Sequence, residues 1–458
     1  MSTFHIWTLG CQMNQADSLK LAAGLESLGY HAVDEDTTAD LVVINTCSVR
    51  QHAEDRAYSR LGVLRKRRVE GKQQFKLAVM GCMVGPKTDE LRKRFPYVDV
   101  WARPQEFDGI LQVAGDYRDV SEGELGALLD DARSGDTASF KMAPGTYGLP
   151  KGPTAYVPVI HGCDKFCTYC IVPLRRGRED SRAAADILDE VRFLADHGVR
   201  EVTLLGQTVE AYGHDLDAAP DGARPDLATL FEGIDRIDGI TRVRFLTSYP
   251  KDMTDRIIDA VADQPKVCEH FNIPVQSGSE SMLDRMRRGY TVAMFEERVA
   301  RIRSRMPDAA IVTDVIVGCP GETEQEFADT VALLERTEFG IIHVAAYSPR
   351  PGTYAARNMP DDVPLAVKKE RLQVVEQIHA ASSARINQAL LGREVEVLVE
   401  QDEQGRSTGR TRQGQLVHFD TPPFRAPRLG ELATIEISQV TPWSLQGHVA
   451  GTLSLAVL

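Results

Sequence analysis

The stretch His161-Gly-Cys-Asp-Lys-Phe-Cys-Thr-Tyr-Cys-Ile171 decides how this chain is interpreted, because it places three cysteines at gaps of three and two residues. Three thiolates spaced in this way can hold three corners of an iron–sulfur cluster. The next cysteine is Cys268, far outside this loop, so the fourth iron would lack a protein ligand. Such an iron could bind a substrate, as the open position of a catalytic zinc does. A structural zinc site with His161 as fourth ligand is the alternative.

Size and composition predict an ordinary globular protein. The chain has 458 residues, of which 43% are hydrophobic and 26% charged, which is enough for two or three packed domains. No apolar run is long enough to span a membrane, and the N-terminus lacks the basic start and apolar core of a signal peptide. We therefore expect a cytoplasmic protein with no membrane partner. In that compartment its eight cysteines would serve metals or catalysis rather than disulfides.

The distribution of charge along the chain is compatible with a nucleic-acid partner. The net charge of −13 disfavours phosphate binding when it is taken alone. However, Arg56–Lys76 contains eight basic residues against one acidic residue, and Gly405–Gly430 contains five against one. A solvated helix face is the alternative explanation for the first of these segments.

The N-terminal region is predicted to be a small parallel α/β domain in which three cysteines converge. The expected strands are Phe4–Leu9, Leu41–Thr46 and Leu77–Met80, and the expected helices are Ser18–Leu28 and Ala53–Arg68. Cys11, Cys47 and Cys82 follow these three strands. Because the carboxyl ends of parallel strands lie along one edge of a sheet, we expect the three thiols to meet there. A buried free thiol is the alternative for any one of them.

The central region alternates strand and helix patterns six times, which predicts a partial TIM-like (β/α)6 barrel. A linker rich in turn residues precedes it, at Ser134–Asp136 and Ala143–Pro150. The expected strands are Ala155–Ile160, Glu201–Leu205, Val243–Thr247, Phe271–Val275, Ile311–Val317 and Ile341–Tyr347. Chemistry in such barrels lies at the C-terminal ends of the strands. The candidate contacts at those ends include Gly206, Gln207, Ser248 and Gln276, although glycine and serine there can also be plain turn residues.

The last 70 or so residues are predicted to form a small antiparallel β-barrel. Alternating runs at Glu394–Val399, Gln415–Phe419 and Leu432–Ile437 are separated by turns rich in glycine and arginine. Oligonucleotide-binding barrels have this pattern, and a structural appendage is the alternative.

At the cysteine loop the sequence resembles the radical SAM enzymes, and the resemblance extends along nearly the whole chain to the methylthiotransferases. It rests on motifs that include Thr8–Ser18, Asn45–Arg50, Met80–Cys82, Arg176–Arg182, Leu205–Gln207, Pro274–Ser279, Asp314–Gly318 and Tyr347–Thr353. The residues around Cys11 and Cys47 are similar to those of the MiaB type, the tRNA 2-methylthio-N6-dimethylallyladenosine synthases. The C-terminal module resembles a TRAM domain. The resemblance implies a methylthiotransferase domain at 3–120, a radical SAM core at 149–384 and a TRAM domain at 385–454.

The resemblance also implies the cofactors and the residues that hold them. Two 4Fe-4S clusters are expected, one on Cys163, Cys167 and Cys170 that also binds S-adenosylmethionine, and one on Cys11, Cys47 and Cys82. Residues expected to contact S-adenosylmethionine are Tyr169, Gly206, Gln207, Ser248 and Gln276. The remaining two cysteines, Cys268 and Cys319, are expected to be buried.

The implied reaction is transfer of a methylthio group to C2 of N6-(dimethylallyl)adenosine beside the anticodon of tRNA, with two molecules of S-adenosylmethionine. The C2–H bond is not acidic enough for a general base, so the chemistry requires a radical. The expected partners are the tRNA anticodon loop, an electron donor such as a flavodoxin or ferredoxin, and a sulfur source, and we expect a monomer. Methylthiolation of a ribosomal-protein side chain and a non-catalytic, zinc-stabilised RNA-binding protein are the alternatives.

Overall fold

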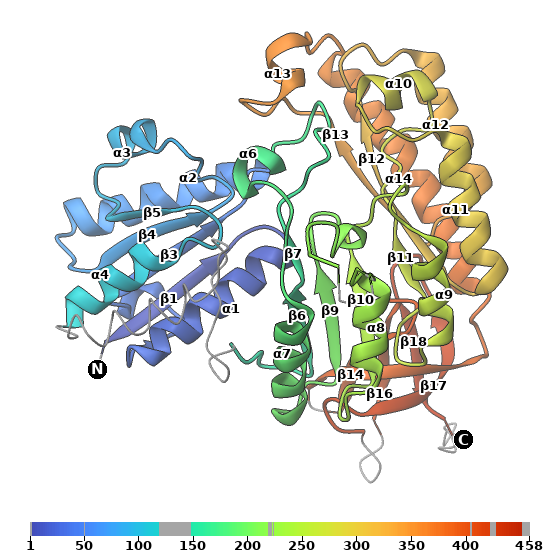
Figure 1. Ribbon diagram of the computed structural model, residues 1–458, viewed down its shortest axis with the longest axis horizontal. Coiled ribbons are helices and arrows are strands. Elements are labelled where there is room, and N and C mark those ends of the chain that lie inside the picture. The colour runs from blue at the N-terminus through green and yellow to red at the C-terminus, as the bar shows by residue number, and fades with distance from the viewer. Residues whose placement is uncertain are drawn as a thin grey trace, which may run out of the picture.

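The structure is a computed structural model that describes residues 2–49, 51–118, 148–218, 222, 224–403, 405–421 and 427–450. Three bodies follow one another along the chain, and the first and last lie against different parts of the central one (Figure 1). The expected linker segment Ser134–Asp136, and all but the last three residues of Ala143–Pro150, lie outside the described residues.

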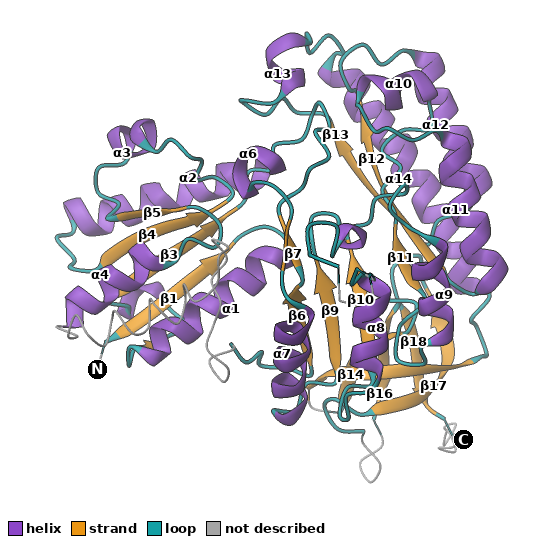
Figure 2. Ribbon diagram, in the orientation of Figure 1, coloured by secondary structure: helices purple, strands orange, loops and turns teal. Residues whose placement is uncertain are grey.

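The N-terminal body is a five-stranded parallel sheet with helices on both faces (Figure 2). In spatial order its strands are β2 (His31–Ala32), β1 (Thr3–Thr8), β3 (Leu41–Thr46), β4 (Lys76–Gly81) and β5 (Val100–Ala102). Its helices are α1 (Gln12–Ser27), α2 (Gln51–Arg65), α3 (Asp89–Arg94) and α4 (Asp108–Arg118), and α2 continues into a π-helical turn at Lys66–Glu70. The three predicted strands are present as neighbours, whereas β2 and β5 were not predicted.

The central body contains the six predicted strands, arranged in chain order as two parallel three-stranded sheets. The strands are β6 (Thr154–Pro158), β9 (Glu201–Leu205), β10 (Arg242–Leu246), β11 (His270–Asn272), β12 (Ala310–Val317) and β13 (Ile341–Ala346). The two sheets join between β10 and β11, where the Ser248 nitrogen donates to the Asn272 oxygen at 3.1 Å. The partial barrel is therefore confirmed.

Helices cover the outside of this partial barrel, and their apolar faces share one large core with its strands. The helices are α6 (Val172–Arg176), α7 (Ala184–Asp196), α8 (Leu227–Asp235), α9 (Asp255–Asp263), α10 (Glu280–Arg285), α11 (Val292–Arg305), α12 (Glu324–Thr337), α13 (Tyr354–Asn358) and α14 (Leu365–Gln388). A short antiparallel pair, β7 (Ile160–His161) and β8 (Asp180–Ser181), encloses the first cysteine loop and α6.

The C-terminal body is a closed five-stranded barrel with the order β14-β15-β16-β18-β17. Its strands are β14 (Glu394–Glu403), β15 (Arg406–Thr411), β16 (Leu416–Asp420), β17 (Leu432–Val440) and β18 (Leu445–Val449). The predicted small antiparallel barrel is confirmed, with one parallel pair, β16 and β18, among its antiparallel neighbours. Strand directions cannot alternate all the way around a closed ring with an odd number of strands, so one pair must be parallel.

Buried arginines attach the C-terminal barrel to the N-terminal ends of the central strands. The guanidinium of Arg242 is fully buried and donates to the carbonyl oxygens of Arg410 and Glu396, at 2.6 and 3.1 Å. Arg244 donates to the carbonyl oxygens of Arg412 and Thr411. The barrel therefore lies at the end of the central body opposite the first cysteine loop (Figure 1).

Candidate active site

The first cysteine loop lies between β7 and α6, at the C-terminal end of the central barrel (Figure 1). Cys163 and Cys167 are buried and Cys170 is half-buried. The loop starts at Gly162 with a φ of +70°, and a Cβ there would lie 1.8 Å from the carbonyl oxygen of Arg178. Only glycine allows the chain to fold back on itself so closely at this point.

Polar groups surround two of the three sulfurs. The Cys163 sulfur lies 3.3 Å from the Thr208 hydroxyl and accepts from the Lys165 nitrogen at 3.4 Å. The guanidinium of Arg288 donates to the Cys167 sulfur at 3.3 Å. Donors directed at sulfur stabilise thiolate ligands, so the loop has the chemistry that a thiolate-bound cluster requires.

Without metal the thiols of Cys163 and Cys170 hold their protons. Burial raises the pKa of Cys163 and raises the pKa of Cys170 to about 12. Burial also holds the pKa of His161 well below its usual value, and its Nδ1 accepts from the amide of Gln105 in the N-terminal domain. Within the described parts of the chain, no three His, Cys, Asp or Glu side chains are spaced to hold a single metal ion.

Three of the residues expected to contact S-adenosylmethionine have a buried oxygen with no hydrogen-bond partner of ordinary geometry. They are Gln207, Ser248 and Gln276, which lie beyond the ends of β9, β10 and β11. Gly206 allows a close approach there, because a Cβ would lie 2.5 Å from a methyl carbon of Ile160. Unpaired buried oxygens are costly unless a ligand donates to them, so these residues fit a cofactor that carries an ammonium group and hydroxyls.

Tyr169 is held between two parts of the central body. Its hydroxyl accepts from Arg288 at 3.4 Å. The preceding residue, Thr168, donates its backbone N–H to the Met286 oxygen and accepts at its carbonyl from the Ala355 nitrogen. Tyr169, which is expected to contact S-adenosylmethionine, is thus held in place by the ends of α10 and α13.

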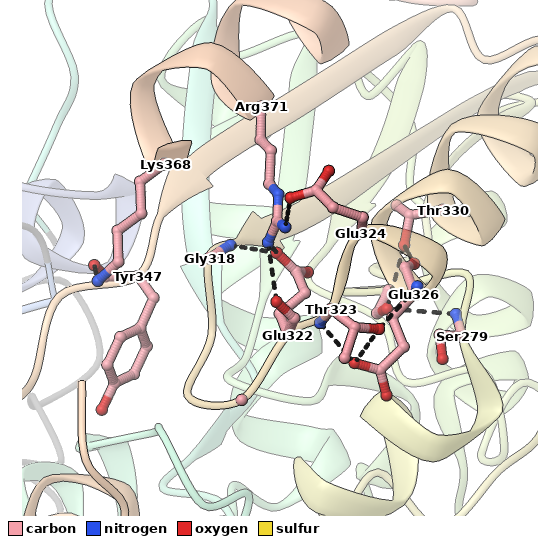
Figure 3. Close-up of polar contacts among 12 residues, drawn as sticks. Ser279, Gly318, Glu322, Thr323, Glu324, Glu326, Thr330, Tyr347, Lys368 and Arg371 are labelled. Carbon is pink, nitrogen blue, oxygen red and sulfur yellow. Dashed lines mark hydrogen bonds and ion pairs between the residues drawn. The ribbon is translucent and has the colours of Figure 1, made fainter. Parts of the chain in front are cut away.

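The turn after β12 is also rigid (Figure 3). The carboxylate of Glu322 accepts from the Gly318 nitrogen at 2.6 Å and from Arg371 of α14 at 2.6 Å. A capping box between Thr323 and Glu326 starts α12 immediately after this turn. Cys319 lies inside the turn and is buried, as is Cys268 elsewhere, which confirms the expectation for both.

The second cysteine trio converges at the C-terminal edge of the N-terminal sheet. Gly10 brings the Cys11 loop against Cys47, because a Cβ on Gly10 would lie 3.3 Å from the Cys47 sulfur. The Cys82 nitrogen donates to the Thr46 oxygen at 2.9 Å, which joins the ends of β3 and β4. Burial, together with negative charge on the neighbouring sulfurs of Cys47 and Cys11, raises the pKa of Cys82 to about 11.

Three residues of the central body near the two cysteine sites make polar contacts with the N-terminal body, and they are Arg176, His161 and Arg350. Arg176 of α6 is buried against α1 of the N-terminal domain, and Gln105 contacts His161. Arg350, in the loop after β13, donates to the Gln51 side chain at 2.9 Å. Arg176 opens one of the motifs that carry the family resemblance, but the sequence pattern assigned it no role, and nothing in that pattern singled out Arg288.

Five arginines of the two basic segments form ion pairs within the protein. Arg60 and Arg67 pair with Asp36, and Arg68 pairs with Asp99. In the C-terminal barrel, Arg410 pairs with Glu400, and Arg412 pairs with Glu269 of the central body. The simple charge count therefore overstates the basic surface available to RNA.

Three family profiles match successive parts of the chain. The UPF0004 profile, described as an uncharacterized protein family, matches residues 3–103. The radical SAM superfamily matches residues 157–334, and the TRAM domain matches residues 388–450. Within the described residues, no helix is both long and apolar enough to cross a membrane.

Curated relatives are similar over nearly the full length. A protein of Dehalococcoides mccartyi named tRNA-2-methylthio-N(6)-dimethylallyladenosine synthase is 41% identical over 455 residues, which are 99% of this chain and 100% of the relative. A protein of the same name from Chloroflexus aurantiacus is 40% identical, covering 97% of this chain and 91% of its own.

Solved structures share the fold at low identity. The radical S-adenosylmethionine methyltransferase TsrM from Kitasatospora setae, with cobalamin and a 4Fe-4S cluster bound, superposes with a TM-score of 0.53. It is 15% identical, and the match covers 78% of this chain and 77% of that one.

The fold and the cysteine loop, together with these matches, define a radical SAM protein, a class that uses an iron–sulfur cluster and S-adenosylmethionine. At about 40% identity over nearly its whole length, the chain belongs to the family of tRNA-2-methylthio-N(6)-dimethylallyladenosine synthases, the MiaB type of radical SAM methylthiotransferase.

Proposed function

We propose that this enzyme transfers a methylthio group to C2 of N6-(dimethylallyl)adenosine next to the anticodon of tRNA. The observation that carries the proposal is the pair of cysteine trios, each at the carboxyl ends of parallel strands, on two domains that are in contact. The trio in the central domain suits a cluster that generates a radical. The trio in the N-terminal domain suits a second cluster that carries sulfur, and it lies close to the same domain interface. Family membership supplies the substrate that this arrangement would act on.

The residues fit two iron–sulfur clusters and S-adenosylmethionine. Cys163, Cys167 and Cys170 hold the cluster with an open iron, and Cys11, Cys47 and Cys82 hold the second. Tyr169, Gly206, Gln207, Ser248 and Gln276 contact S-adenosylmethionine. When bound, these cofactors supply the radical that removes an unreactive hydrogen, the sulfur-bearing site, and a methyl group from a second S-adenosylmethionine.

The protein's own residues hold and shield these groups. Arg288 and Thr208 direct polar hydrogens at the first trio of sulfurs, which stabilises their thiolate forms. The orphaned oxygens of Gln207, Ser248 and Gln276 would orient the cofactor's donors. Burial of Cys163 and Cys167 limits the access of water, which would otherwise quench reactive intermediates.

Two pairs of an exposed aromatic ring and an arginine near the first cysteine loop suit an RNA substrate. Phe166, inside the loop, is 57% exposed and has the Arg178 guanidinium 5.8 Å from its ring centre. Tyr354 starts α13, is 46% exposed, and has the Arg287 guanidinium 4.1 Å from its ring centre. Unstacked RNA bases bind aromatic faces and arginine planes, so an opened anticodon loop would find such groups at the entrance of the site.

The proposed reaction needs two further partners, because the protein's side chains can supply neither the electron nor the sulfur atom. The reaction consumes an electron and a sulfur atom, so it requires a small electron carrier such as a flavodoxin or ferredoxin and a separate sulfur source. The enzyme works as a monomer in the cytoplasm, where tRNA is modified.

Two measurements test this function. Anaerobically reconstituted protein should be brown and bind about eight irons per chain, and Cys163→Ala should retain about half of them. Mass spectrometry of tRNA nucleosides from a deletion strain should show loss of the 2-methylthio adduct. Persistence of the adduct would favour a protein side chain as substrate, and a colourless protein that contains only zinc would refute the radical reaction.

A further inference from the structure

Arg176 belongs to the central domain, but its guanidinium is buried in the N-terminal domain. It is the last residue of α6, the short helix that begins two residues after Cys170. Its Nη2 donates to the Asp17 carboxylate at 3.0 Å and to the Asn14 side-chain oxygen at 2.9 Å, both on α1. The side chains of Arg176 and Asp17 are only 2% and 1% exposed.

The guanidinium lies beside the second cysteine trio. The Asn14 oxygen that accepts from Arg176 also lies 3.8 Å from the Cys11 sulfur, so one acceptor contacts both groups. The charge of Arg176 acts on the nearby sulfurs of Cys82 and Cys11, since it lowers the pKa that burial has raised at Cys82.

One donor nitrogen of this guanidinium makes no well-formed hydrogen bond, although the guanidinium lies close enough to the Cys82 sulfur to lower the pKa of that thiol by hydrogen bonding. The Nη1 of Arg176 is buried and makes no hydrogen bond of ordinary geometry. A buried charged donor without a good hydrogen bond costs free energy unless an anionic group accepts a hydrogen bond from it. A cluster ligated by three thiolates is such an acceptor, because its sulfurs carry negative charge.

We propose that Arg176 is a positioning residue that crosses the domain interface to donate to the sulfurs of the second cluster. The inference rests on the second cluster proposed above. Hydrogen bonds to sulfur and nearby positive charge raise the reduction potential of an iron–sulfur cluster, because both stabilise the more negative reduced state. Because the arginine comes from α6, the second cluster gains this stabilisation only while the two domains are docked. The same helix thereby links the two cysteine sites, since Cys170 and Arg176 are six residues apart.

A redox titration followed by electron paramagnetic resonance tests the proposal. A Cys163→Ala background leaves only the second cluster, and Arg176→Met and Arg176→Lys are added to it. We expect Arg176→Met to shift the midpoint potential of that cluster downward and Arg176→Lys, which keeps the charge but not the fork of donors, to shift it less. Arg192→Met, an exposed arginine on α7 that pairs with Asp189, is the matched control and should leave the potential unchanged.

The outcomes separate this proposal from the one on which it rests. Absence of iron from the Cys163→Ala parent would refute the second cluster itself. A normally loaded parent with the same potential in both Arg176 variants would overturn the role of Arg176 alone. If Arg176→Met loses its iron while Arg176→Lys and Arg192→Met keep theirs, the result supports the role, because the cation is then required for the cluster to stay bound.

Discussion

Single residues beside the cysteines, rather than the cysteines alone, determine whether the sulfurs can meet. Gly81 has a φ of +95°, and a Cβ there would lie 2.4 Å from the Thr46 carbonyl oxygen and 2.5 Å from the Asn45 side-chain oxygen. Both neighbours lie at the end of β3, directly before Cys47. The close approach of β3 and β4 therefore depends on the missing side chain of one glycine.

Replacing this glycine should remove the second cluster and spare the first. In Gly81→Ala the strand ends must separate, which displaces Cys82, so we expect iron content to fall by about half. The control is Gly62→Ala on α2, where a Cβ would meet nothing within 4 Å. That variant should keep all its iron and gain up to about 1 kcal/mol of stability. Full iron content in Gly81→Ala would show that the glycine is dispensable.

The carboxyl group of Glu210 should make stability depend on pH. It is buried behind the end of β9 and accepts from the Tyr249 nitrogen at 3.1 Å. Burial raises its pKa to about 8 in the folded protein. Between its unfolded pKa and about pH 8 the group is neutral when folded and ionised when unfolded. The free energy of unfolding should therefore fall as pH rises through this window, by at most about 1.4 kcal/mol per pH unit from this group.

Glu210→Gln should remove this dependence, because the amide stays neutral in both states. Urea unfolding of the wild type and the variant at pH 5.5 and 7.5 gives the comparison. We expect the variant to gain stability relative to the wild type at the higher pH. Equal changes in both proteins between the two pH values would mean that Glu210 is ionised in the folded state.

At the residue scale, the sequence predicts the cysteines that would ligate the clusters better than it predicts the residues packed around them. A cysteine is rare enough for its spacing and its place after a strand to indicate a metal site. Arg176 and Glu210 are common residue types, and only the fold shows that both are buried beside the site. Their burial depends on contacts across domains or between loops distant in sequence, which no local pattern encodes.

At the scale of elements, two properties decide whether a strand can be predicted from sequence. They are the length of the strand and how clearly its inward-facing residues are apolar. The six central strands were predicted because mostly apolar segments of five or more residues are distinctive. The strands β2 and β7 have two residues each, too few for any periodicity. The sequence did not predict β15, because the residues of β15 that face the barrel interior are small or polar rather than apolar. A Cβ at its Gly409 would lie 2.0 Å from the Leu398 oxygen, so an apolar residue does not fit there.

The first cysteine loop and α13 present the groups that should contact RNA. In Phe166→Ala and Tyr354→Ala we expect weaker binding of an anticodon stem-loop, by about 1–3 kcal/mol for each lost stacking contact. Fluorescence anisotropy at fixed salt measures this. Trp443→Ala is the control, because that ring is 61% exposed on the distant C-terminal barrel. A larger loss with Trp443→Ala than with either loop variant would place the main RNA contact on the barrel instead.

At the scale of the whole molecule, the position of the C-terminal barrel could not be predicted. Its strands indicated a barrel, but the residues that attach it are arginines, which a sequence pattern assigns to the surface. Arg242 and Arg244 instead point from β10 to backbone oxygens of β14, β15 and the turn after β15. Backbone acceptors have no sequence signature, so this kind of docking is visible only in the fold.

The attachment of this barrel should depend strongly on Arg242. In Arg242→Met the carbonyl oxygens of Arg410 and Glu396 lose their donor in a buried interface, so we expect the free energy of unfolding to fall by roughly 1–3 kcal/mol for each oxygen left without a partner. Arg406→Met, at an exposed position of β15, is the control and should cost under about 0.5 kcal/mol. Urea unfolding and limited proteolysis around residue 390 should both report the change, because a released barrel exposes the end of α14. If Arg242→Met unfolds at the same urea concentration as Arg406→Met and resists protease equally, the barrel must be held by its other contacts, among them those of Arg244.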